Sequence, residues 1–92
     1  MSPLAPECEA EIWSRTIQPE NGDLAPQAAE ALLKLKLRPK DIQRVNELSE
    51  KARQGTLSDV EAQELDSYLN VGRALELLKA KARLSLRNGR DQ

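Results

Sequence analysis

Carboxylates are the groups in this 92-residue chain whose type and spacing come closest to catalytic chemistry. They gather in two runs, Glu7 to Glu11 and Asp59 to Asp66. Acid–base catalysis by carboxylates needs two of them in a cleft, in surroundings that separate their pKa values. Acids on the solvated face of a helix do not meet that requirement. The chain contains no histidine, which excludes a Cys-His pair and an ordinary zinc site. We therefore expect no catalytic residue, no bound metal and no cofactor.

The single cysteine, Cys8, is the remaining candidate nucleophile. It lies between Glu7 and Glu9, whereas reactive cysteines are typical of electropositive surroundings. One cysteine cannot form an internal disulfide, which fits a reducing compartment. The four glycines stand apart from one another, so phosphate-binding and dinucleotide-binding loops are absent. These observations predict a protein that is not an enzyme.

Basic residues form two clusters that could contact phosphates and give salt-sensitive binding to nucleic acid. The members of the two clusters are Lys34, Lys36, Arg38 and Lys40 (residues 34–40), and then Lys79, Lys81, Arg83, Arg87 and Arg90 (residues 79–90). The net charge is only −1, however, and one Trp and one Tyr leave little to stack on bases. Acids in the early turns of the last predicted helix also argue against its use as a DNA-recognition helix. A nucleic-acid-associated protein is therefore our alternative interpretation.

The stretch from Ser58 to Arg87 predicts one long helix with apolar residues on two faces. The first stripe comprises Leu65, Tyr68, Val71, Leu75, Leu78, Ala82 and Leu86. The second stripe falls on roughly the opposite side, and with its flanking bases it forms our candidate protein-binding surface: Leu69, Arg73, Leu77, Ala80, Lys81 and Leu84. Other helices of the same chain could cover both stripes. If they do not, the second stripe needs a partner protein or a second copy.

The remaining pattern predicts an all-α fold, a small bundle of three to four helices with a long C-terminal helix. Shorter helices are expected over residues 7–17, 26–35 and 39–53, with Pro26 and Pro39 at two of the starts and Gly55 as a C-terminal cap. Ser58 and Glu61 form a capping-box pattern for the long helix. We expect a disordered leader over residues 1–6, a single domain over 7–87, and a loose tail over 88–92 after a stop at Asn88-Gly89. No apolar run approaches the ~20 residues that a membrane span requires, so we expect a cytoplasmic protein.

Two segments resemble a known group of proteins. The first is Ile12-Trp13-Ser14-Arg15 ahead of a Pro-Glu-Asn-Gly-Asp loop; the second runs from Val45 through the Gly-Thr-Leu-Ser turn to Leu84. Together they resemble a family of short, uncharacterised bacterial helical proteins that are often encoded beside genes for HNH- or PIN-type nucleases. The resemblance implies a bacterial accessory protein, antitoxin-like in role, and assigns no functional residues.

The favoured hypothesis is thus a small interaction module that binds a partner protein or itself through its C-terminal helix. The exposure of Leu77 and Leu84 tests this hypothesis, because their burial within a single chain would remove the second apolar face.

Overall fold

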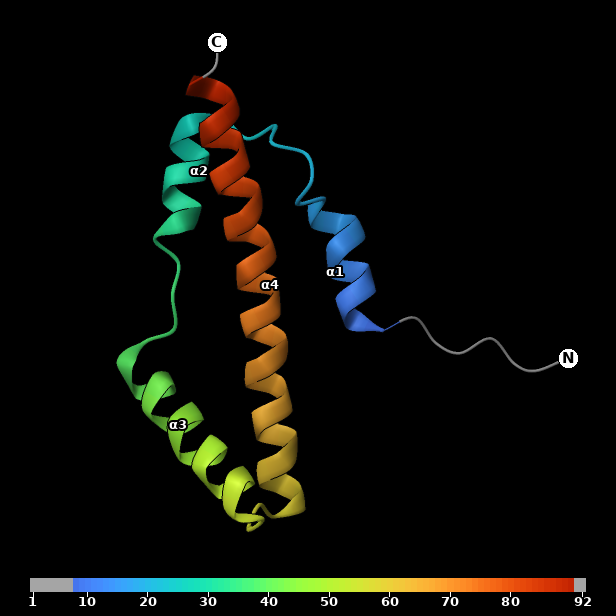
Figure 1. Cartoon of the computed structure of the whole chain (residues 1–92), viewed down its shortest axis with the longest axis vertical. Helices are drawn as coiled ribbons and strands as arrows, with labels where there is room; N and C mark the ends of the chain where they lie inside the picture. The colour runs from blue at the N-terminus through green and yellow to red at the C-terminus, as the bar shows by residue number, and fades with distance from the viewer. Residues whose placement is uncertain (1–7, 91–92) are drawn as a thin grey trace, which may run out of the picture.

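The computed structural model describes residues 8–90, which form four helices (Figure 1). These are α1 (Glu9–Ile17), α2 (Pro26–Leu33), α3 (Pro39–Gln54) and α4 (Asp59–Arg90). The predicted all-α class with a long C-terminal helix is confirmed. With 32 residues, α4 is about 48 Å long at 1.5 Å per residue. Within the described range, no helix combines the length and the apolar character that crossing a bilayer demands.

The helix boundaries follow local capping chemistry. Pro26 and Pro39 are the first residues of α2 and α3, where the missing N–H of proline costs no hydrogen bond. Gly55 ends α3 with a φ of 71°, a left-handed conformation that favours glycine. The capping box at the start of α4 is confirmed in both directions. The Ser58 N–H donates to the Glu61 carboxylate at 3.1 Å, and the Glu61 N–H donates to the Ser58 hydroxyl at 3.1 Å.

Two predicted helix ends are wrong. α2 stops at Leu33 rather than Leu35, because its last turn tightens into i→i−3 bonds before an extended connection to α3. α4 does not stop at Asn88-Gly89 but continues to Arg90. There the Asn88 side-chain amide lies 3.5 Å from the Gly22 carbonyl, and Gly89 stays helical despite the low helix propensity of glycine. The expected leader over residues 1–6 lies outside the described residues, as does the end of the expected tail.

The helices lie in a single layer with α4 as its axis (Figure 1). α1 packs along one side of α4, while α2 and α3 pack along the other side, and none of these three packs against another. The smallest dimension of the chain is 16 Å, against 52 and 47 Å along the other two principal axes. The core is correspondingly small. Its buried apolar residues are Ile17, Ala29, Leu48 and Ala82.

The connection between α1 and α2 packs closely against the C-terminal half of α4. A Cβ added to Gly22 would lie 2.8 Å from Leu84 Cγ and 2.9 Å from the Leu84 carbonyl carbon, so only glycine fits there. The Leu24 N–H donates to the hydroxyl of the buried Ser85 at 3.1 Å, and Ser85 in turn donates to the Lys81 carbonyl. This connection therefore anchors α1 and α2 to the same stretch of α4.

Ion pairs join α3 to the N-terminal half of α4 around the buried Leu48. Arg44 donates to both oxygens of Glu64, at 2.9 and 2.8 Å, in a bidentate pair. Lys51 Nζ lies 2.5 Å from Glu61. α3 diverges from α4 toward its own N-terminus (Figure 1).

Candidate protein-interaction face

A groove of about 670 Å³ runs along the middle of α4. Its floor belongs to α4 and its two walls come from α1 on one side and from the α2–α3 connection and α3 on the other. Its lining residues are Ala10, Ser14, Leu37, Val45, Tyr68, Leu69, Gly72, Arg73, Glu76 and Leu77. The groove brings together segments that are far apart in the sequence, which is why the local pattern does not reveal its walls.

A second hollow of about 380 Å³ lies on the same side of α4, one turn beyond the first. It is lined by Pro19 from the α1–α2 connection and by Ala80, Arg83, Leu84 and Arg87 from α4. Glu76 in the first hollow and Ala80 in the second are four residues apart, so they share one helix face. We call the two hollows together the α4 furrow.

The furrow contains most of the protein-binding residues predicted from the sequence: Leu69, Arg73, Leu77, Ala80 and Leu84. Leu69 is 45% exposed, a large value for a leucine in the middle of a helix. Leu77 and Leu84 are each partly covered, Leu77 beside α1 and Leu84 beside the Gly22 segment. They are neither buried nor bare. The chain thus covers its second apolar stripe incompletely.

Gly72 is open in this structure. A Cβ built on it would meet no atom within 4 Å, so the chain itself places no helix against this glycine. Its lack of a side chain lowers the floor of the furrow between Leu69 and Leu77. Gly72 lies outside the candidate surface predicted from the sequence.

Lys81 lies in an internal contact rather than in the furrow. Its Nζ donates to the carbonyls of Ile17 and Gln18, at 2.9 and 3.4 Å, and lies 2.8 Å from the Asp23 carboxylate. The Lys81 side chain is only 11% exposed. The hydrogen bond from Lys81 lowers the pKa of Asp23. Lys81 is therefore a structural residue that fastens the α1–α2 connection, and we leave it out of the proposed binding surface.

The basic residues of the alternative nucleic-acid interpretation are divided among different surfaces. Lys34, Lys36, Arg38 and Lys40 are exposed around the α2–α3 connection. On α4, Lys79 and Lys81 are two residues apart, which places them about 200° apart around the helix. Arg83 and Arg87 line the furrow, and Arg83 lies 3.7 Å from Glu76. Nucleic-acid binding stays a prediction that the geometry does not strengthen.

Two carboxylates of the second acidic run, Glu61 and Glu64, act in ion pairs and in a helix cap. Glu61 bonds to Lys51 and Ser58, which lowers its pKa to about 2, and the pKa of Glu64 is lowered by its bond from Arg44. Tyr68 donates to Asp41 at 2.8 Å, which raises the pKa of the phenol. All of these residues connect α3 to α4. Their surroundings lower both carboxylate pKa values, whereas a general acid requires a raised one.

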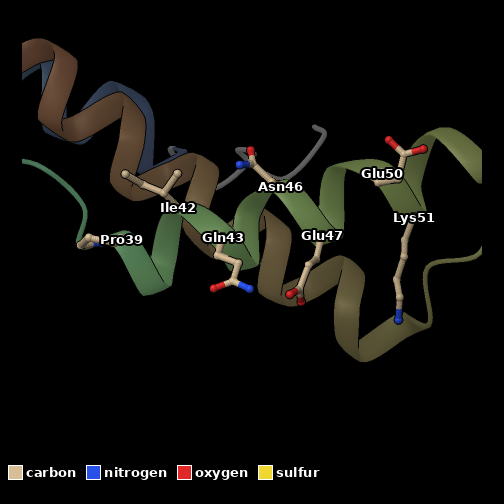
Figure 2. Close-up of a pocket in the computed structure, with 7 residues that line it drawn as sticks. All are labelled: Pro39, Ile42, Gln43, Asn46, Glu47, Glu50 and Lys51. Atoms are coloured by element: carbon tan, nitrogen blue, oxygen red, sulfur yellow. The ribbon is translucent and has the colours of Figure 1, made fainter.

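A further open hollow of about 730 Å³ runs along α3 (Figure 2). Figure 2 shows that one helix supplies its lining, with Ile42, Asn46 and Glu50 on one side of α3 and Glu47 and Lys51 on the other. Lys51 and Glu47 already take part in ion pairs with Glu61 and Arg44. This hollow follows the surface of a single helix and lacks the second wall that would hold a ligand.

No cluster of three or more His, Cys, Asp or Glu side chains that could hold a metal ion occurs within the described part of the chain. No protein-family model, curated protein or solved structure matches this sequence or fold. The geometry of the α4 furrow is therefore the basis of the functional argument.

Proposed function

We propose that this protein is a non-enzymatic interaction module that binds another protein chain through the α4 furrow. The observation that carries the proposal is the exposure of Leu69 beside the open Gly72, between walls formed by α1 and α3. Binding pockets for proteins combine an apolar centre with a polar rim. Leu69 and Leu77 supply the centre, and Arg73 and Glu76 supply the rim.

The finer form of this proposal is an antitoxin-like accessory role in a bacterial cytoplasm. It is supported by the sequence resemblance to helical proteins encoded beside nuclease genes. An amphipathic helix of a partner would suit a furrow of this kind, because such a helix presents apolar anchors at i, i+3 and i+4. This role requires a nuclease gene next to the gene of this protein, and the nuclease is then the partner.

Substitution of Leu69 tests the proposal directly. We expect Leu69→Asp to abolish co-purification with the product of the adjacent gene when the two are co-expressed, because a carboxylate in the apolar centre loses its hydration on binding. Val71→Asp is the matched control. Val71 is 48% exposed, close to the value for Leu69, but two residues along α4 and thus on another side of the helix. The proposal fails if Leu69→Asp binds every protein that the wild type binds.

A further inference from the structure

We infer that the occupant of the α4 furrow is a second copy of this chain, with the two α4 helices antiparallel. This inference depends on the proposed function, that the α4 furrow binds a protein chain, and it names a second copy of this chain instead of a nuclease as the occupant. It rests on the spacing, the exposure and the charge order of one stripe of residues, which we call the furrow stripe. Its members are Ala62, Asp66, Leu69, Arg73, Glu76, Ala80, Arg83 and Arg87.

The furrow stripe has the spacing of a helix-pairing seam. Its members follow one another at alternating intervals of four and three residues, the repeat at which two helices interlock side by side. Six of the members line the two hollows of the furrow. Ala62 and Ala80 are partly exposed and the other members are exposed, so no helix of this chain occupies the seam. The stripe spans about 38 Å of α4, which suits one short helix pair rather than an extended coiled coil.

The charge order of the furrow stripe is complementary to itself in the antiparallel direction. A two-fold axis between residues 74 and 75 sets Asp66 opposite Arg83 of the second copy, and Arg73 opposite Glu76 of the second copy. The same axis sets Leu69 opposite Ala80, and Ala62 opposite Arg87. Each charged member of the furrow stripe from Asp66 to Arg83 thus meets an opposite charge, and each pair occurs twice, as an isologous interface requires.

A parallel pair of α4 helices would instead bring like charges together. In that arrangement each residue faces its own copy, so Asp66, Arg73, Glu76 and Arg83 would all meet like charges. Juxtaposed like charges in an interface are unfavourable. The charge order therefore selects the antiparallel arrangement. Glu76, which lies 3.7 Å from Arg83 in the single chain, exchanges that exposed ion pair for Arg73 of the second copy at little cost.

Pairing through the furrow also gives the molecule a second layer of helices. Stable domains consist of at least two packed layers, whereas this chain forms one layer 16 Å thick. Two copies stacked face to face along α4 supply the second layer and cover Leu69. Gly72, which has no neighbour within 4 Å, leaves room beside Arg73 for the second backbone to approach.

Charge reversal tests the inference in solution. Analytical ultracentrifugation of the wild type should show a dimer, and Arg73→Glu should raise its dissociation constant by at least about tenfold, since each dimer then contains two like-charged contacts. Glu76→Arg alone should weaken the dimer similarly. The double variant should restore the affinity to within about threefold of the wild type, because both pairs are re-formed with their charges exchanged. Lack of rescue in a double variant that stays helical by circular dichroism contradicts the register.

Cysteine cross-linking tests the same register independently, in a Cys8→Ser background. Asp66→Cys with Arg83→Cys should give a disulfide-linked dimer on mild oxidation, because each cysteine meets the other one across the axis. Either single substitution should give none, since the two copies of one position then lie ~25 Å apart along the axis. Cross-linking by the single variants would overturn the antiparallel arrangement.

A wild-type protein that stays monomeric at ~100 µM and gives no cross-link would overturn the second copy as occupant. If such a monomer still binds the product of the adjacent gene through Leu69, the proposed function stands and only this inference fails. If it binds neither, both fail.

Discussion

Lys81 shows how a single residue can belong to a charged pattern in the sequence and to the interior in the fold. Its ammonium group has three oxygen partners, two of them backbone carbonyls at the end of α1. Bonds of this kind, between a charged donor and partly buried acceptors, contribute more to stability than bonds between neutral groups. The position of α1 against α4 depends on this side chain.

We expect Lys81→Met to lower the free energy of unfolding by about 1–3 kcal/mol, because the carbonyls of Ile17 and Gln18 lose their donor. Urea denaturation followed by circular dichroism measures the loss. Lys79→Met is the control, since Lys79 lies two residues away on another side of the helix. Equal stability of the two variants would show that Lys81 does not fasten the α1–α2 connection.

The junction of α3 and α4 shows how one residue can serve two helices. Glu61 caps the start of α4 through the Ser58 N–H and pairs with Lys51 of α3 at 2.5 Å. Both bonds favour the ionised carboxylate, and its pKa falls from 4.5 to about 2. Because the folded pKa lies below the unfolded one, this stabilisation is complete above about pH 4.5 and is lost as the pH falls toward 2.

Glu61→Gln should therefore lessen the acid sensitivity of the fold. Gln still accepts the capping bond from Ser58, but its amide does not titrate. We expect the urea midpoint of the wild type to fall more steeply than that of the variant between pH 5 and 2. Glu30→Gln, on an exposed site of α2, serves as the control and should follow the wild type. Parallel curves for Glu61→Gln and the wild type would contradict the role of this ion pair.

The sequence predicts what depends on neighbours along the chain. Pro26, Pro39, Gly55 and the Ser58–Glu61 box each mark a helix end, because caps use residues within one turn. The packing of α1 and of the α1–α2 connection on α4 depends instead on contacts between residues more than sixty positions apart. Lys81 reaches the end of α1, and Asn88 contacts Gly22 from the part of α4 that lies past the predicted stop. No local pattern encodes those partners.

The sequence likewise predicts only the part of the candidate surface that belongs to α4. Helical spacing identified Leu69, Leu77 and Leu84 as an apolar stripe, since the spacing depends on α4 alone. The furrow walls come from α1, α3 and their connections, which the spacing cannot place. The degree of cover also depends on how the helices are arranged. The apolar pattern alone does not say whether the other helices surround α4 or lie on two of its sides, as they do in this chain (Figure 1).

The whole molecule consists of three short helices that each pack only on α4, and this arrangement limits how far a local perturbation spreads. Leu48→Ala removes the one large, fully buried side chain between α3 and α4, so we expect a loss of about 2–5 kcal/mol at that junction. Hydrogen exchange should then speed up in α3 and in the N-terminal half of α4, while amides of α1 keep their wild-type rates. Ile17→Ala, at the α1 contact, should give the converse pattern. A uniform increase across all four helices in either variant would mean that α4 couples its neighbours into a single cooperative unit.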